Sequence, residues 1–202
     1  MSQQEYRQAL IAAGQRLDRH GWVPGGGGNF SVRLAPGQFL LTVSGRHKGH
    51  LSENDFLLVD AAGQSLEAGR TPSAETLLHC ERYAALPAIG CVLHGHSPAA
   101  TVLGRRHAEP WLELQDYEML KGLGGVQSHD ATVAVPLFDN DQDMDRLAAH
   151  IRARHAARPI EHGYIIRGHG VYAWGTTVEQ ALWRYESLEF LLQCQLMELQ
   201  IR

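Results

Sequence analysis

Apolar residues recur along this chain with two periods, and each period predicts a different element. A spacing of three to four residues, typical of one face of a helix, runs through Tyr6, Leu10, Ala13 and Leu17. Ser2 and Glu5 form a capping-box pattern at the start of this stretch, and Gly21 is a natural end. The first twenty residues therefore predict an amphipathic helix.

Strict alternation, with a period of two, predicts strands that bury one face. Residues 30–34 and 39–43 alternate in this way on either side of Pro36 and Gly37, which predicts a hairpin. Shorter apolar runs predict further strands at residues 56–59, 89–93, 111–114, 132–135, 164–166 and 171–174.

Helix signals separate these strands. Thr71 and Pro72 match an N-cap followed by a proline in the first turn, which predicts a helix that continues to Leu86. Further helices are predicted from Pro98, from Met144 to Arg154, and from Val178 to Leu199. A short helix through Met119 is predicted as well, with Asp116 as its cap and Gly122 at its end.

The order of these elements predicts the fold class. Several strands are joined by short turns, so a purely parallel sheet is not expected. We expect an α/β fold of three layers, α/β/α, with a mixed, largely antiparallel central sheet and helices on both faces. No repeat or linker divides the chain, so residues 1–202 predict a single domain.

Composition narrows the class of protein. The chain is 44% hydrophobic and 20% charged with a net charge of -4, so it has no general attraction to nucleic acid or anionic membranes. The N-terminus lacks a signal-peptide pattern, and no apolar run is long enough for a membrane span. Cys80, Cys91 and Cys194 are odd in number and far apart, which predicts reduced thiols in a cytoplasmic protein.

The first candidate chemistry is a pair of histidines after a buried strand. His94 and His96 stand two residues apart where the run at 89–93 ends. Side chains two apart on an extended backbone point to the same side, so both imidazoles can reach one metal ion. An H-x-H pattern also occurs by chance on surfaces, and a third ligand is needed for tight binding.

His169 is the candidate for that third ligand. It lies between Gly168 and Gly170, which allow the backbone to approach a neighbour closely. A histidine at a hairpin tip has the same appearance. His79, His129 and His162 are rival ligands, and the spacing alone does not separate them from His169.

Two carboxylates compete for the role of general acid and base beside such a metal. Glu118 stands between apolar stretches, where its position alone favours an exposed helix residue. Glu75 lies on the predicted helix that precedes the histidine-bearing strand. Loops at residues 25–31, 44–49 and 71–73 carry the backbone N–H groups, hydroxyls and cations that bind phosphate.

Taken together, these segments resemble the class II aldolase/adducin family over nearly the whole chain. The matching segments are Gly28 to Ser31, Ser44 to Gly49, Pro72 to Thr76, the pair His94 and His96, Tyr117 to Met119, Phe138 to Asp143, and Arg167 to Gly170. The histidines are shared with aldolases and epimerases of sugar phosphates. The Ser44 loop, the Tyr-Glu-Met segment and the Asn-Asp-Gln-Asp run indicate the dehydratase branch.

The resemblance implies zinc on His94, His96 and His169, with Glu118 as the acid/base of a dehydratase. In the aldolases Glu75 occupies the place of that group. The resemblance also implies that Gly28, Asn29, Ser44, Gly45, Lys48 and Ser73 bind the substrate and its phosphate. It further implies a homotetramer with active sites between subunits.

The activity implied is dehydration of 5-methylthioribulose 1-phosphate in methionine salvage. A sugar-phosphate aldolase, a pentulose-phosphate 4-epimerase and a non-catalytic adducin-like binding module are the alternatives. The chain departs from its relatives at Gly25, Gly26 and Gly27, where they usually carry one or two hydroxyl residues. Only backbone donors remain there, which weakens the assignment of phosphate binding to this loop.

Overall fold

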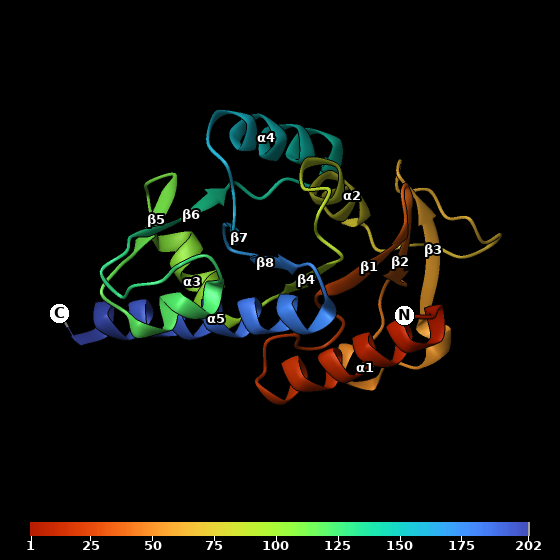
Figure 1. The fold of residues 1–202 in the computed structure, drawn as a ribbon, viewed down its shortest axis with the longest axis horizontal. Coiled ribbons are helices and arrows are strands. Elements are labelled where there is room, and N and C mark those ends of the chain that lie inside the picture. Colours follow the sequence, from red (N-terminus) through yellow and green to blue (C-terminus); the bar gives the residue numbers. More distant parts are fainter. Residues whose placement is uncertain (202) are drawn as a thin grey trace.

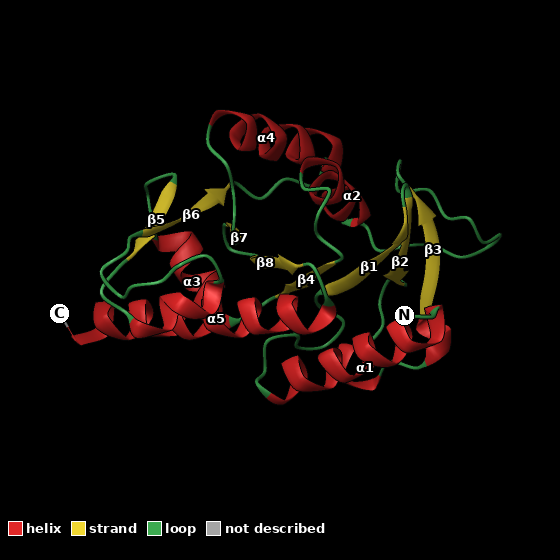
Figure 2. Cartoon of the chain, viewed as in Figure 1, coloured by secondary structure: helices red, strands yellow, loops and turns green. Residues whose placement is uncertain are grey.

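One eight-stranded sheet organises the computed structural model, which describes residues 1–201 (Figures 1 and 2). Its strands are β1 (Asn29–Ala35), β2 (Gln38–Thr42), β3 (Phe56–Asp60), β4 (Cys91–Gly95), β5 (Trp111–Leu114), β6 (Val133–Phe138), β7 (Gly163–Ile166) and β8 (Gly170–Gly175). Their order is β3-β2-β1-β4-β8-β7-β6-β5, and every pair is antiparallel except β6–β7. The prediction of a mixed, largely antiparallel sheet is confirmed.

Helices cover both faces of this sheet, as predicted. They are α1 (Gln3–Arg19), α2 (Thr76–Ala85), α3 (Pro98–Arg106), α4 (Met144–Ala157) and α5 (Val178–Ile201), with 3-10 helices η1 (Lys48–His50), η2 (Glu53–Asp55) and η3 (Glu118–Leu123). Helices α1, α3 and α5 pack in one apolar cluster, and α2 and α4 pack in the other (Figure 1). The sheet lies between these two layers.

Local sequence signals explain several helix starts. Ser2 and Glu5 form the expected capping box at α1, and Ser97 accepts a hydrogen bond from Ala100 N where Pro98 begins α3. Both devices satisfy backbone N–H groups that the first helical turn leaves unpaired.

The predicted start of the second helix is wrong. Helix α2 begins at Thr76, because Pro72 forms an isolated bridge with Val43 and keeps residues 71–75 out of the helix. Glu75 therefore occupies the N-cap position and not the helix interior.

The short helix predicted after Asp116 is present, as a 3-10 helix that begins at Glu118 and ends at Leu123. Its N-cap is Tyr117 and not Asp116, which has a φ of 64° in the left-handed region.

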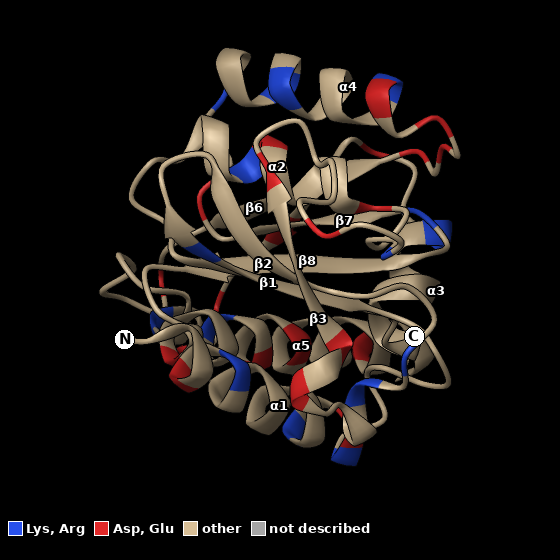
Figure 3. Ribbon diagram, turned by 90° about the vertical axis from the view of Figure 1, so that its right-hand side faces the viewer, with Lys and Arg blue, Asp and Glu red and all other residues tan. Residues whose placement is uncertain are grey.

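The surface of the molecule is mixed in charge. Basic and acidic residues are interspersed along α1, whereas α4 has one acidic residue near its start, Asp145, and three arginines (Figure 3). Within residues 1–201, no helix combines the length and apolar character needed to cross a membrane.

Candidate active site

The centre of the sheet positions the histidine pair. Strand β4 lies between β1 and β8, and it ends at Gly95 between the two histidines. His94 is completely buried, and its Nδ1 donates to the carbonyl oxygen of Val171 in β8 at 2.9 Å. Because that nitrogen carries the proton in the neutral ring, Nε2 presents a lone pair. The Nε2 atoms of His94 and His96 are 2.8 Å apart.

The β7–β8 hairpin brings His169 to the same point. Gly168 has a φ of 65°, which a glycine adopts at little cost. A Cβ on Gly170 would lie 2.1 Å from the carbonyl oxygen of Gly95, so only glycine lets the hairpin press against β4 here. His169 Nε2 then lies 3.0 Å from His96 Nε2.

A carboxylate completes the cluster. The oxygens of Glu75 lie 2.9 Å from His169 Nε2 and 3.1 Å from His94 Nε2. Asn29 Nδ2 and the hydroxyl of Tyr172 donate to Oε2 of Glu75 at 2.7 and 2.8 Å. The four groups that could hold a metal ion thus come from α2, β4 and the β7–β8 turn.

Burial and charge set the protonation of this cluster. Burial lowers the pKa of His94 to about 3 and also lowers the pKa of His96, with His169 as a second cause. Burial alone would raise the pKa of Glu75, but His94 and the hydrogen bonds from His169 and Asn29 outweigh it, so the pKa lies well below its usual range. An anion therefore stands beside the neutral ring of His94.

This arrangement fits a divalent metal ion. The Nε2 atoms of His94 and His169 lie 2.8 and 3.0 Å from His96 Nε2. Because His96 Nε2 carries at most one proton, a hydrogen bond from this proton satisfies only one of the two contacts. A tetrahedral zinc ion with bonds of about 2.0–2.1 Å separates its nitrogen ligands by about 3.3 Å. Three imidazoles with one carboxylate are a donor set that zinc accepts.

A pocket of about 150 Å³ opens beside His96 and Glu75. All six residues that the resemblance implies for substrate and phosphate line it: Gly28, Asn29, Ser44, Gly45, Lys48 and Ser73. Lys48 is buried, and its Nζ donates to the carbonyl oxygen of Gly26 at 3.1 Å. Burial lowers the pKa of Lys48 to about 8.

Packing against His96 explains one glycine of the run that lines this pocket. A Cβ on Gly27 would lie 2.7 Å from His96 Nδ1, whereas a Cβ on Gly26 would meet nothing closer than 3.8 Å. The loop therefore approaches the His96 ring at Gly27.

Glu118 lies apart from this pocket. It begins η3, its side chain is 74% exposed, and Lys121 donates to it at 2.6 Å. The carboxylate that joins the histidines within one chain is Glu75.

The rival histidines have other surroundings. His129 is exposed and pairs with Asp130 at 2.9 Å, and His162 lies 3.6 Å from Glu161. His79 is buried in α2 and bonded to Asn29 and Ser31.

Asp18, His47 and His50 form a second group of metal-ligating types. His47 Nδ1 accepts from Gly49 N at 3.2 Å. The neutral ring therefore carries its proton on Nε2, the nitrogen nearest Asp18. That proton leaves this group less prepared for a metal than the His94 cluster.

One residue of the site was missed by sequence reasoning. Tyr172 stacks on the His94 ring at 4.0 Å between centroids and donates to Glu75. It stands in a continuous apolar strand, so no pattern distinguishes it. His79 was named as a rival metal ligand, whereas the structure places its ring against Asn29 and Ser31; its spacing of one helical turn from Glu75 was the available signal for this position.

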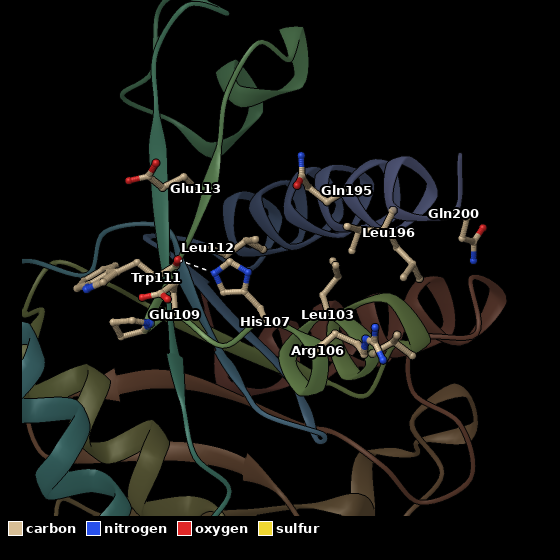
Figure 4. A pocket seen from close by; sticks show the side chains of 13 residues that line it. Leu103, Arg106, His107, Glu109, Trp111, Leu112, Glu113, Gln195, Leu196 and Gln200 are labelled. Carbon is tan, nitrogen blue, oxygen red and sulfur yellow. Dashed lines mark hydrogen bonds between the residues drawn. The ribbon is translucent and has the colours of Figure 1, made fainter. Parts of the chain in front are cut away.

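A larger cavity lies elsewhere. It has a volume of about 920 Å³ and lies between α3, β5 and the end of α5 (Figure 4). In the wall of this cavity, His107 Nε2 donates to the carbonyl oxygen of Trp111 at 2.8 Å, so this ring nitrogen already has a hydrogen-bond partner (Figure 4).

Comparison with known proteins agrees with this fold. Residues 8–196 match the model of the family described as Class II Aldolase and Adducin N-terminal domain. The chain belongs to this family.

Curated relatives match along nearly their full length. Methylthioribulose-1-phosphate dehydratase of Pseudomonas syringae pv. tomato is 50% identical over 196 residues, which are 97% of this chain and 96% of the relative. The protein of that name from Gluconacetobacter diazotrophicus is 52% identical over 189 residues, with coverage of 94% and 91%. Among solved structures, L-fuculose-1-phosphate aldolase from Thermus thermophilus aligns with a TM-score of 0.78 at 25% identity, covering 98% and 96% of the two chains.

Proposed function

We propose that this chain is a lyase that dehydrates 5-methylthioribulose 1-phosphate to 5-methylthio-2,3-dioxopentyl phosphate and water. The observation that carries the proposal is the convergence of His94, His96 and His169 beside a pocket built for a small phosphorylated ligand. The identity of about half of all residues with curated dehydratases, over nearly full length, supports the same reaction.

The metal of this proposal is zinc, held by His94, His96 and His169. Its support is the convergence of these three imidazoles, with the Nε2 lone pair of His94 directed at an anionic carboxylate. When bound, such an ion supplies Lewis-acid stabilisation of negative charge on the ketose oxygens. Glu75 lies close enough to these rings to complete the ligand set or to exchange a proton with substrate.

The phosphate group occupies the pocket of about 150 Å³ in this proposal. Ser44 and Ser73 offer hydroxyls, Gly28 and Gly45 offer backbone N–H groups, and the Lys48 ammonium offers a positive charge. These donors are the types that bind phosphate in other proteins. They would hold C1 of the sugar at one end of the site.

The acid/base of the proposal is Glu118. Its carboxylate takes the proton from C3, the C4–O bond breaks, and the departing hydroxyl receives a proton to leave as water. The resulting enol then becomes a ketone at C3, with a proton added at C4. All carbon atoms stay in one product, which is the substrate less one water.

Glu118 is exposed and outside the pocket of its own chain, so we propose that it acts in the site of a neighbouring subunit. Trp183, Phe190 and Met197 support such association, because they form an exposed apolar stripe along α5 at intervals of seven residues. Met119 and Gly122 of η3 line one hollow with Trp183 and Phe190. A subunit that covers the stripe would therefore lie close to Glu118. The proposed assembly is a homotetramer.

Methionine salvage in the cytoplasm is the setting that goes with this reaction. Cys80, Cys91 and Cys194 are all free thiols, which supports a reducing compartment.

An aldolase or 4-epimerase is the second candidate. Its support is the position of Glu75, which stands among the histidines where the aldolase relatives carry their acid/base. The intact set of three convergent imidazoles argues against an adducin-like binding module.

Product mass separates these functions. The purified protein would be incubated with 5-methylthioribulose 1-phosphate, with and without a chelator. A dehydratase gives one product lighter by one water, and only without the chelator. Two smaller fragments would indicate an aldolase, inversion at C4 with unchanged mass would indicate an epimerase, and no reaction would favour the binding module.

A further inference from the structure

A chain of buried hydrogen bonds runs from Glu75 away from the pocket into the sheet. Asn29 Nδ2 donates to Glu75 Oε2 at 2.7 Å, and Asn29 Oδ1 contacts His79 Nε2. His79 Nδ1 lies 2.7 Å from Ser31 Oγ, which lies 2.8 Å from the hydroxyl of Tyr83. Asn29, Ser31, His79 and Tyr83 are each no more than 4% exposed, so water does not compete for these bonds.

The carboxylate fixes the direction of every donor in this chain. An ionised Glu75 only accepts, so the amide nitrogen of Asn29 and not its oxygen must face Glu75. The amide oxygen then faces His79, which must carry a proton on Nε2. His79 Nδ1 therefore accepts the hydroxyl proton of Ser31, and Ser31 accepts from Tyr83.

The opposite arrangement is unfavourable at one place. If His79 carried its proton on Nδ1, its Nε2 lone pair would require the amide nitrogen of Asn29. The amide oxygen of Asn29 would then lie against the carboxylate of Glu75, and two acceptors would face each other without a proton. A single tautomer of His79 thus corresponds to a single orientation of the Asn29 amide.

We propose that His79 is a positioning residue for the reaction: by donating from Nε2 to Asn29, it holds the Asn29 amide and through it the Glu75 carboxylate. Asn29 lines the substrate pocket, and Nδ2 has a second hydrogen beyond the one given to Glu75. His79 therefore orients one amide group toward two partners: the Glu75 carboxylate beside the metal ligands, and an oxygen of the bound substrate. This inference rests on the proposed function only in that its kinetic test measures the proposed dehydration.

The surroundings suit a neutral ring at this position. Burial lowers the pKa of His79 to about 4, with attraction to Glu75 opposing the shift. A neutral imidazole has one donor and one acceptor, which matches its two partners. The ring also lies edge-on to Tyr172, 5.7 Å between centroids, and Tyr172 is a further donor to Glu75.

The test compares His79→Leu with His79→Gln. Leucine fills space without donating, whereas the glutamine amide nitrogen restores a donor toward Asn29. We expect His79→Leu to lower kcat by about 10–100-fold, as for other groups behind metal ligands, with a smaller change in KM and near-normal metal content. His79→Gln should recover most of the lost kcat. Equal losses of kcat in both variants, or full kcat in His79→Leu, would overturn the proposal.

A double-mutant cycle with Ser31→Ala adds a readout that general destabilisation does not move. Ser31→Ala should lower kcat in the wild-type background and have little further effect in His79→Leu, because the chain is already broken. Independent losses that add would contradict a connected chain. Leu78→Ala is the matched control, since Leu78 is buried in the same helix without bonding to this chain. It should lower stability and leave kcat unchanged.

Nitrogen NMR of the wild-type protein keeps the inference separate from folding defects and from the proposed function. His79 should show one neutral tautomer with its proton on Nε2 between about pH 5 and 8. A proton on Nδ1, or a mixture of tautomers, would overturn the proposed direction. If the protein fails to dehydrate the pentulose phosphate while His79 shows this tautomer, the proposed function fails and the hydrogen-bond chain stands.

Discussion

His94 Nδ1 donates to the carbonyl oxygen of Val171 at 2.9 Å across the β4–β8 pair. This bond fixes the ring and directs its Nε2 lone pair at His96 and Glu75. The sheet thus orients a nitrogen ligand in advance of metal binding, in the way that hydrogen-bonded partners orient histidines at metal centres.

Replacement of one ligand tests the histidine cluster. His94→Asn removes the Nε2 atom at the centre of the cluster, so the remaining ligands should hold zinc at least about 100-fold more weakly. Activity should fall with the metal content. Both can be followed by metal analysis of the purified variant and by its turnover.

His129→Asn is the control for the metal content, because His129 is exposed, pairs with Asp130 and is not among the four residues of the cluster. Equal loss of metal from both variants would contradict a site built on His94.

Removal of the charge at Glu118 tests the acid/base assignment. Glu118→Gln keeps the size of the side chain, so zinc should stay bound while kcat falls by about 10²–10⁴-fold. Glu113→Gln, at an exposed position in β5, should behave as wild type. If Glu118→Gln turns over normally, the assignment fails and Glu75 becomes the acid/base.

The glycine loop offers a steric test of His96. Gly27→Ala would place a Cβ 2.7 Å from His96 Nδ1, so the ring must move and zinc affinity should drop about tenfold or more. Gly26→Ala is its matched control, because its Cβ has at least 3.8 Å of clearance. Competition with a metal-sensitive dye would measure both affinities. Equal affinities for the two variants would show that His96 does not depend on this contact.

The lowered pKa of Lys48 predicts that substrate binding depends on pH. Because burial lowers its pKa to about 8, the ammonium is present below that pH and is lost as the pH rises through it. The kcat/KM of the free enzyme should therefore begin to fall above about pH 8. Lys48→Met should lower kcat/KM at neutral pH and remove this fall. A fall that persists unchanged in Lys48→Met would assign it to another group.

The sequence was informative where a local pattern decides the geometry. The extended backbone predicted from the apolar run at residues 89–93 placed His94 and His96 on one side, and the same two-residue repeat identified the first hairpin. Both follow from the two-residue repeat of an extended chain, which neighbouring elements do not alter.

Long-range packing decided the features that the patterns missed. Thr71 and Pro72 look like a helix start, yet the bridge from Pro72 to Val43 delays α2 and turns Glu75 toward the histidines. His79 was a rival metal ligand by sequence, whereas the fold brings Ser31 and Asn29 against it. These contacts join residues that lie far apart in the sequence, and no local spacing encodes them.

Metal content measured together with turnover tests the central claim most directly. A chelator should remove the metal and the dehydration of 5-methylthioribulose 1-phosphate in proportion, and stoichiometric zinc should restore both. Wild-type protein should then bind one ion per chain. A preparation that retains full turnover after its metal has been removed would contradict the account.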